Sequence, residues 1–270
     1  MNQLNQKPWR PPLLVYATIA LHVLALTALL MYPQQWLWPL AAVLINHAIL
    51  IVTGLWPRSH WLGKNWTRLP VAATQRHEIA LTIDDGPDPD VTPQVLRILD
   101  QYDVKATFFC IGGKAQQFPD LCQEIVRRGH AVENHTQRHW HNFSMLGPKS
   151  LVREIQSAQI VLEGITGQAP QFFRAPAGLR NMFLDYALNR LGLQLASWSV
   201  RGFDTRIGDV DKVKARITKG LHAGAILLLH DGNAARTTGG IPVIIEVLPA
   251  ILESAKESGL RFVTLRNAAL

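Results

Sequence analysis

The chain has 270 residues, 48% of them hydrophobic, which is enough for one large domain and a further segment. Its formal net charge of +7 could indicate nucleic-acid binding, but the Lys and Arg residues are scattered and form no basic stripe interleaved with aromatic side chains. We therefore expect no nucleic-acid partner and attribute the excess to attraction to anionic lipid. Two cysteines, Cys110 and Cys122, are too few for a disulfide framework, and both are predicted to be free.

Two uncharged apolar stretches occupy the N-terminal part of the sequence, at residues 12–32 and 36–56. Each suits a membrane-spanning helix of about 20 residues. A cleaved signal peptide is the alternative for the first stretch, but no small-residue cleavage site precedes the second. Aromatic residues cluster at the short connection, where they suit a membrane interface. Residues 1–56 are therefore predicted to be a membrane anchor, a transmembrane hairpin of two helices.

Positive charges flank this hairpin on both sides, and its turn carries none. Lys7 and Arg10 precede the first stretch. Four basic residues follow the second stretch: Arg58, Lys64, Arg68 and Arg76. The positive-inside rule places both ends in the cytoplasm, so we expect an inner-membrane protein whose main domain, residues 78–270, faces the cytoplasm. A periplasmic domain is the alternative. Residues 57–77 are predicted to be a basic juxtamembrane linker.

From residue 78 onward, short apolar runs alternate with longer amphipathic ones. The runs typical of strands are 79–83, 106–111, 130–133, 172–173, 194–200, 225–229 and 262–265. Helical patterns between them begin near Thr92, Ala115, Lys149, Met182, Val210 and Ile241. This alternation predicts an α/β fold with a parallel sheet and outer helices. The number of runs indicates a barrel, or near-barrel, of about seven or eight units.

Ionisable residues follow these runs at the ends that would form the mouth of a barrel. They are Asp84 and Asp85 after the first run, His135 and His139 after the third, Arg174 after the fourth, Asp204 after the fifth and His230 after the sixth. The active site of a β/α barrel lies on loops at the carboxyl ends of its strands. We therefore expect these side chains to converge. Asp231, next to His230, is either an orienting partner of that histidine or part of a turn.

One carboxylate and two imidazoles of this set have the chemistry of metal ligands. His135 and His139 lie at i, i+4, a spacing at which two imidazoles can share one face of a helical turn and bind one ion. With a carboxylate from the first loop they provide three protein ligands and an open position, which is typical of catalytic zinc. The alternative for the acidic stretch is an ordinary turn, because Asp, Gly and Pro are common at strand ends.

Four ordered motifs make residues 79–265 resemble the polysaccharide deacetylases, carbohydrate esterase family four. The motifs are Thr82-Ile83-Asp84-Asp85-Gly86, His135-Thr136-Gln137-Arg138-His139, Arg174-Ala175-Pro176-Ala177-Gly178 and Leu228-Leu229-His230. The resemblance implies a distorted (β/α) barrel that removes N-acetyl groups from amino sugars with a divalent metal. By motif position it implies that Asp85, His135 and His139 bind the metal, and that Asp84 is the general base.

The same resemblance implies supporting roles: Arg174 holds the base, His230 is the general acid, and Leu228 forms a wall of the acetyl-methyl pocket. The chemistry is consistent with these roles. An amide is a poor electrophile with a poor leaving group, so its hydrolysis needs a polarised carbonyl, an activated water and a proton for the amine. Ala177 stands where an aromatic is common in the family, which indicates a more open mouth, and a backbone N–H near it could donate to the oxyanion.

The segment 198–205 departs from the family pattern. Members typically show two aspartates followed by Trp, whereas here Arg201 replaces the first aspartate and Thr205 replaces the Trp. Asp204 remains, and we expect it among the catalytic residues. Trp198 and Arg201 are expected to contact substrate together with Leu228 and Ala177. Arg201 would be free to pair with a phosphate, since a guanidinium binds phosphate in bidentate fashion. The alternatives are a salt bridge to Asp204 or simple exposure to water.

The sequence thus predicts a membrane-anchored, metal-dependent hydrolase that removes the N-acetyl or another N-acyl group from an amino sugar in a lipid-linked or cell-envelope glycan. Zn²⁺ is the expected metal, and membrane lipids are expected partners. A deformylase of a lipid-phosphate-linked amino sugar would use the same residues. A catalytically inactive module that binds glycan or lipid is the alternative from another class. Loss of activity usually removes a ligand or the base, and all of these residues are present here.

Overall fold

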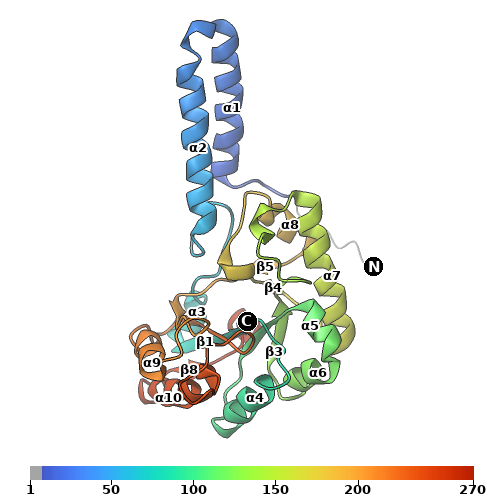
Figure 1. Ribbon diagram of the computed structural model, residues 1–270, viewed down its shortest axis with the longest axis vertical. Coiled ribbons are helices and arrows are strands. Elements are labelled where there is room, and N and C mark those ends of the chain that lie inside the picture. The colour runs from blue at the N-terminus through green and yellow to red at the C-terminus, as the bar shows by residue number, and fades with distance from the viewer. Residues whose placement is uncertain (1–7) are drawn as a thin grey trace.

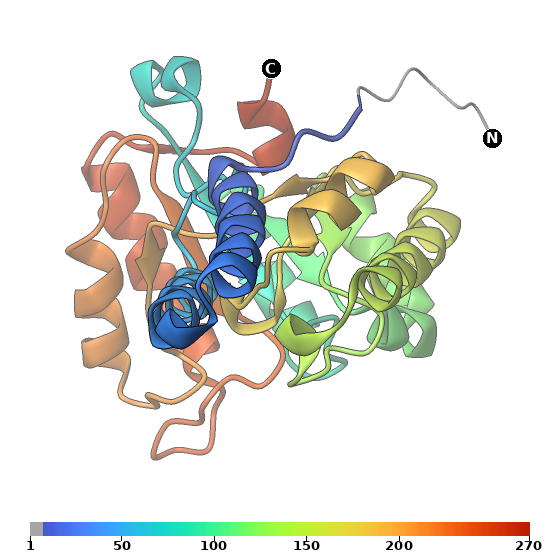
Figure 2. The ribbon, with the colours of Figure 1, turned by 90° about the horizontal axis from the view of Figure 1, so that it is seen from above.

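The computed structural model describes residues 8–270. Lys7 and the rest of the first seven positions of the predicted anchor therefore lie outside the described residues. Two long helices project from an α/β domain (Figure 1). Seen from above, the hairpin stands over the middle of the domain, with the green helices on one side and the orange and red C-terminal helices on the other (Figure 2).

The hairpin consists of α1 (Leu13–Met31) and α2 (Leu37–Leu55), joined by the 3₁₀ turn η1 (Pro33–Gln35). Both helices are long and apolar enough to cross a membrane, judged by length and composition. Only 11% and 17% of their most apolar windows are buried, whereas the core helix of a soluble protein would be mostly buried. The two helices also bond to each other, since Thr18 Oγ1 donates to Asn46 Oδ1 at 3.2 Å.

The sheet is parallel throughout and curled, as predicted for a distorted barrel. Its strands are β1 (Glu78–Asp84), β2 (Thr107–Cys110), β3 (Ala131–Asn134), β4 (Phe172–Phe173), β5 (Gln194–Leu195), β6 (Val200–Arg201), β7 (Ile226–His230) and β8 (Arg261–Phe262). Their order is β5-β4-β3-β2-β1-β7-β6, and β8 pairs with β1 outside this path. The register places Asp84 of β1 opposite His230 of β7, so two predicted site residues are neighbours in the sheet.

Helices cover the outer face of the sheet, in agreement with the predicted fold class. They are α3 (Val71–Gln75), α4 (Thr92–Gln101), α5 (Gly112–Gln117), α6 (Pro119–Arg127), α7 (Pro148–Thr166), α8 (Leu184–Leu191), α9 (Val210–Thr218), α10 (Val243–Glu257) and α11 (Leu265–Ala268), with the 3₁₀ turns η2 (Phe143–Met145) and η3 (Pro176–Gly178). The helix predicted near Ala115 is in fact two helices, because Pro119 cannot continue the hydrogen-bond ladder of α5 and begins α6 instead.

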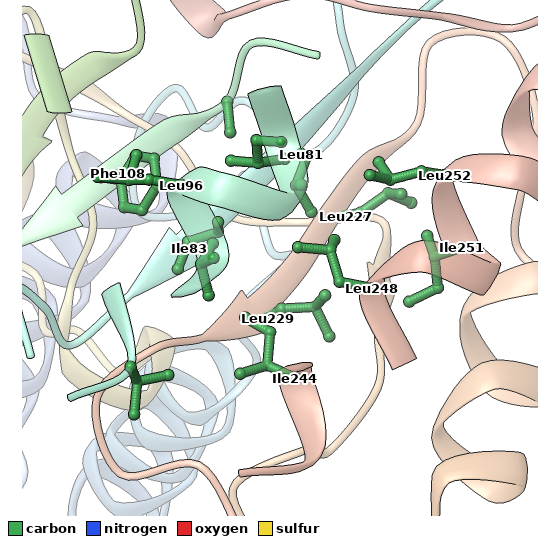
Figure 3. Close-up of a cluster of buried hydrophobic side chains, with 14 of the residues drawn as sticks. Leu81, Ile83, Leu96, Phe108, Leu227, Leu229, Ile244, Leu248, Ile251 and Leu252 are labelled. Carbon is green, nitrogen blue, oxygen red and sulfur yellow. The ribbon is translucent and has the colours of Figure 1, made fainter. Parts of the chain in front are cut away.

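The alternation of side chains along β1 sets the site apart from the core. Leu81 and Ile83 pack against α4 and α10 in the main hydrophobic cluster, to which Leu248 also belongs (Figure 3). Because successive residues of a strand point to opposite faces, Thr82 and Asp84 point into the barrel. The whole strand is buried, so its inward-facing polar side chains must find partners inside the protein. Cys110 and Cys122 are buried and free, as predicted.

The prediction of one strand over 194–200 is wrong. The segment forms two short strands at opposite edges of the sheet: β5 pairs with β4, and β6 pairs with β7. Between them the chain crosses the opening of the incomplete barrel, and the carbonyl groups of Ala196 and Ser197 turn inward to accept hydrogen bonds from Arg174. These carbonyl groups, which would bond to a neighbouring strand if 194–200 were one continuous strand, thus accept hydrogen bonds from a buried guanidinium.

Residues 57–77, predicted as a linker, are packed against the domain. Leu62, Leu69 and Ala73 are buried. The Trp66 amide donates to the Leu195 carbonyl at 2.8 Å, and the Leu69 amide donates to the Gly224 carbonyl at 2.9 Å. The segment therefore hydrogen-bonds to residues on both sides of the gap between β5 and β6. It connects the base of the hairpin to the barrel.

Candidate active site

A cleft of about 720 Å³ lies at the carboxyl ends of the strands and is lined by most of the predicted site residues. A larger cavity of about 1290 Å³ lies between the N-terminal segment and α8. Among the described residues, the one group of side chains with metal-binding chemistry is Asp85, His135 and His139, which lines the smaller cleft. Chemistry rather than size therefore identifies the cleft as the candidate active site.

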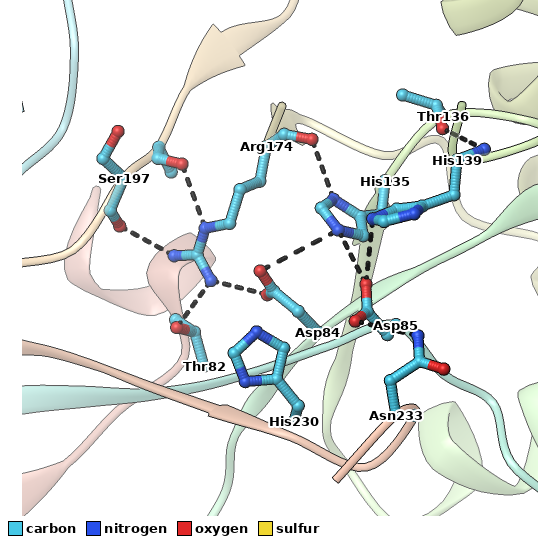
Figure 4. Close-up of polar contacts among 12 residues, drawn as sticks. Thr82, Asp84, Asp85, His135, Thr136, His139, Arg174, Ser197, His230 and Asn233 are labelled. Atoms are coloured by element: carbon cyan, nitrogen blue, oxygen red, sulfur yellow. Dashed lines mark hydrogen bonds and ion pairs between the residues drawn. The ribbon is translucent and has the colours of Figure 1, made fainter. Parts of the chain in front are cut away.

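Asp85, His135 and His139 place three ligand atoms together. The Nε2 atoms of both histidines lie 3.1 Å from Asp85 Oδ1 (Figure 4). Tetrahedral bonds of about 2.0–2.1 Å would put ligand atoms roughly 3.3 Å apart, so the observed spacing fits one ion. Asn233 Nδ2 donates to the second oxygen, Asp85 Oδ2, at 3.3 Å, and Lys114 Nζ donates to the Asp85 carbonyl at 2.8 Å. Both contacts fix this ligand in place.

The tautomer of His135 supports a metal at this point. Its Nδ1 lies 2.8 Å from the Arg174 carbonyl oxygen, which can only accept, so Nδ1 carries a proton. In the neutral imidazole, Nε2 is then an acceptor facing the acceptor Asp85 Oδ1, and a cation between them resolves the conflict. Burial alone would lower the pKa of His135, but the carboxylates of Asp84 and Asp85 outweigh it and raise that pKa. The pocket thus favours positive charge.

The electrostatics of Asp85 give the same result. Burial would raise the pKa of its carboxyl, but the contacts with the imidazoles of His135 and His139 outweigh burial and hold this pKa well below its ordinary value. An ionised carboxylate with two imidazoles is a donor set that zinc accepts. The residues present therefore fit a divalent metal.

The two histidines do not share a helical turn, so that part of the prediction is wrong. They lie on the loop after β3, where Thr136 (φ 69°) and His139 (φ 53°) adopt left-handed backbone conformations. Side-chain bonds stabilise these: the Thr136 amide donates to Asn134 Oδ1, and the His139 amide donates to Thr136 Oγ1, each at 2.9 Å. A left-handed conformation costs a non-glycine residue on the order of 1 kcal/mol or more of folding free energy. Such strained residues cluster at functional sites.

Arg174 holds Asp84 from inside the barrel. Its side chain is 1% exposed, and Nη1 donates to Asp84 Oδ1 at 2.6 Å and to Thr82 Oγ1 at 2.8 Å (Figure 4). Burial lowers the pKa of Arg174, and the carboxylate of Asp84 partly offsets this. A guanidinium keeps its proton even so. Asp84 Oδ2 is left facing the metal ligands, 4.0 Å from His135 Nε2.

Asp204 orients His230 at the end of β7. Asp204 Oδ1 accepts from His230 Nδ1 at 3.0 Å, and Oδ2 accepts from the His230 amide at 2.7 Å. Burial would lower the pKa of His230, but Asp204 and then Asp84 and Asp85 outweigh it and raise that pKa. Asp231 makes a different contact, with Thr92 Oγ1, and burial raises its pKa to about 7. The orienting alternative for Asp231 is therefore wrong.

The remaining predicted residues, Leu228, Ala177, Trp198 and Arg201, all line the cleft. Arg201 makes no salt bridge to Asp204, whose two carboxylate oxygens are both bonded to His230. Sequence reasoning missed Lys114 and Asn233. Lys114 follows the second strand and Asn233 the seventh, so extending the strand-end rule to every strand would have found both.

Comparisons with known proteins agree with this geometry. The family model for polysaccharide deacetylase matches residues 72–196. A peptidoglycan-N-acetylglucosamine deacetylase of Bacillus cereus is 31% identical over 214 residues, covering 77% of this chain and 75% of the relative. A chitooligosaccharide deacetylase of Azorhizobium caulinodans is 37% identical over 155 residues, covering 57% of this chain and 73% of the relative.

A solved structure shares the fold. The Bc1960 peptidoglycan N-acetylglucosamine deacetylase superposes with a TM-score of 0.67 and 30% identity, covering 76% of this chain and 92% of the other. Fold and site define the class of carbohydrate esterase family four, whose members are in general metal-dependent. The chain belongs to the polysaccharide deacetylase family and is an N-deacetylase, a hydrolase of linear amides.

Proposed function

We propose that the protein hydrolyses the N-acetyl, or another N-acyl, amide of an amino sugar in a lipid-linked or cell-envelope glycan. The observation that carries the proposal is the convergence of three elements in one cleft: a metal-binding triad, a carboxylate held by a buried arginine, and a histidine held by a buried carboxylate. These correspond to the three requirements of amide hydrolysis, a polarised carbonyl, an activated water and a proton for the leaving amine.

Asp85, His135 and His139 would hold the metal, and the proposed ion is Zn²⁺. A bound zinc ion supplies a Lewis acid that polarises the amide carbonyl and lowers the pKa of water toward about 7. Asn233 holds the carboxylate of Asp85 and Lys114 holds its backbone carbonyl, so the ligand set is pre-arranged rather than assembled on binding.

Asp84 acts as the general base in this proposal. Arg174 occupies Asp84 Oδ1, so Oδ2, on the side of the metal ligands, is the oxygen that takes the proton of the attacking water. The paired guanidinium balances the charge of the carboxylate before transfer. Since Arg174 is bonded to four oxygen atoms of the barrel interior, it also prevents Asp84 from swinging away.

His230 acts as the general acid. Asp204 accepts a hydrogen bond from the protonated Nδ1 of His230. Nε2 is therefore the ring nitrogen left to protonate the departing amine. The raised pKa of His230 favours the protonated form that this step requires. Leu228, Trp198 and Ala177 line the same cleft. We assign the apolar wall to Leu228 and Trp198 and the oxyanion donor to a backbone N–H near Ala177.

The names of the relatives support an N-acetylglucosamine-type unit, because one relative is named for peptidoglycan and the other for chitooligosaccharide. The two apolar helices support a membrane anchor, and the basic flank after α2 supports a cytoplasmic domain. A periplasmic domain, where finished cell-wall polymer lies, is the competing placement.

The test is acetate release from chitooligosaccharide and from a glycolipid bearing N-acetylglucosamine, using the full-length protein in detergent. Acetate should appear, stop on treatment with a chelator and return on addition of Zn²⁺. Formate release from N-formyl versions of the same sugars tests the deformylase alternative. Full metal occupancy without release of either acid would support the inactive binding module instead.

A further inference from the structure

Arg201 is a cation of the cleft without an ionic partner. It lies in β6 and lines the same cleft as the metal ligands, and none of the salt bridges among residues 8–270 includes it. Its Nε atom is buried and makes no hydrogen bond to any described residue. A buried charged donor left without an acceptor is costly, and native structures usually supply a partner or a ligand for it.

Two aromatic rings hold the guanidinium in position. Its Cζ lies 5.3 Å from the centre of the Trp198 ring and 4.9 Å from that of Phe203. Phe203 is partly exposed and has a φ of 60°, so the backbone adopts a strained conformation where this ring meets Arg201. Aromatic contacts are made with the faces of a guanidinium, which leaves its N–H edge available to an oxyanion.

The charge of the cleft favours an anionic substrate. Lys114, Arg138, Arg201 and Arg206 line it against two carboxylates, Asp84 and Asp85, a net of +2 with the histidines counted as neutral. Both carboxylates are already committed, Asp84 to Arg174 and Asp85 to the metal-binding histidines. The arginines therefore have no acidic groups within the cleft to neutralise them.

The position of Arg201 links this charge to the hairpin. Pro57 lies two residues beyond α2, and its carbonyl accepts from Ser197 Oγ at 2.7 Å. Gly178 is wedged between Pro57 and Trp198, because an added Cβ would lie 2.6 Å from a carbon of each. Trp198 in turn faces Arg201. A chain of contacts through Gly178 and Trp198, which both line the cleft, thus connects the base of the hairpin to Arg201.

We propose that Arg201 is a phosphate-binding residue of the cleft, and that the substrate is an N-acylated amino sugar joined through a phosphate to a membrane lipid. The inference rests on the proposed N-deacylase function and names its substrate class. The N–H edge of Arg201 pairs with two phosphate oxygens, while the sugar extends from the phosphate toward the metal triad. The lipid tail lies on the side of the hairpin.

The first test measures binding and needs no turnover. Full-length protein in detergent, loaded with Zn²⁺, is titrated with citronellyl phosphate, with citronellol and with inorganic phosphate. Citronellyl phosphate should bind more tightly than either of the others, and Arg201→Ala should weaken its binding about tenfold or more, as expected for a charge-assisted bidentate pair. The affinity of Arg201→Lys for citronellyl phosphate should lie between those of the wild type and Arg201→Ala, since an ammonium keeps the charge but not the bidentate geometry.

The second test compares turnover of two matched substrates, citronellyl-phospho-N-acetylglucosamine and the neutral citronellyl N-acetylglucosaminide. Arg201→Ala should lower the ratio of their kcat/KM values about tenfold or more. Arg153→Ala, which removes an exposed arginine outside the cleft, should leave the ratio unchanged.

The outcomes separate the two proposals. Equal binding of citronellyl phosphate by the wild type and Arg201→Ala would overturn the phosphate assignment, and so would equal losses on both substrates, which would make Arg201 an organiser of the catalytic site. Equal affinity for inorganic phosphate and citronellyl phosphate would reject a lipid in favour of a soluble phosphate. Failure of every N-acyl substrate with the phosphate preference intact would reject the proposed function alone.

Discussion

The two sides of the cleft differ in the kind of charge they gather. On the side of β1 and β3, carboxylate and imidazole acceptors converge with Asp85 at their centre. On the side of β6 and β7 stand the donors, His230 with its raised pKa and Arg201. In the proposed mechanism, an amide that enters between them meets the groups that activate water on one side and the proton donor on the other. Under this proposal, the difference lets one cleft promote both the attack of water and the departure of the amine.

The largest effect is expected from breaking the acceptor side. Asp85→Ala or His135→Ala should remove the bound metal and reduce acetate release to background, because a three-ligand site cannot spare one ligand. Metal analysis of the purified variants checks this. His60→Ala, at an exposed histidine, serves as the control, and thermal unfolding shows whether the variants fold. Full metal occupancy in both variants would reject the ligand assignment.

A smaller loss should follow when the base is removed and the metal is kept. Asp84→Asn should retain the metal but lower kcat by about a hundredfold or more, because an amide cannot accept the proton of water. Paired measurements of metal content and initial rate test this. Asp90→Asn makes the same change at an exposed aspartate of the neighbouring loop and should be silent. If Asp84→Asn keeps near-normal activity, the base lies elsewhere.

The donor side can be tested through its pH dependence. A general acid must be protonated, so activity falls as pH rises through its pKa, and the raised pKa of His230 extends activity to higher pH. Asp204→Asn removes the strongest of the charges that raise this pKa, so the alkaline limb of kcat/KM should move to lower pH by about one unit. Asp211→Asn, at an exposed position of α9, provides the comparison. An alkaline limb that stays in place would show that Asp204 does not raise the pKa of the general acid.

The smallest effect on activity is expected from a reporter fused after Leu270. Such a fusion tests on which face of the membrane the domain, with both sides of the cleft, lies. Basic residues flank the hairpin, so green fluorescent protein should fluoresce there and alkaline phosphatase should be inactive. Acetate release should be unchanged by either fusion. Active alkaline phosphatase at this position would place the domain in the periplasm.

The sequence by itself determined the α/β class, the parallel sheet and the residues that meet at the mouth. These follow from local rules: apolar periodicity identifies strands and helices, and parallel strands bring their carboxyl ends to one edge. A carboxylate of the first loop could therefore be grouped with His135 and His139 from the sequence, and the family resemblance singled out Asp85 as that carboxylate. The strict two-residue alternation of β1 also determined that Asp84 and Thr82 face inward while Leu81 and Ile83 face the helices.

Only the tertiary structure decided which polar groups are partners inside the barrel. Arg174 reaches Asp84 across 90 positions of sequence, and Asp204 rather than the adjacent Asp231 orients His230. Between the two edge strands of 194–200, the same buried guanidinium bonds to the Ala196 and Ser197 carbonyls. The left-handed loop that joins the two histidines is held by contacts with Asn134 and Thr136. Such pairings are decided by distances of a few tenths of an ångström between remote segments, because a buried polar group takes whichever partner the packed chain brings within hydrogen-bond range.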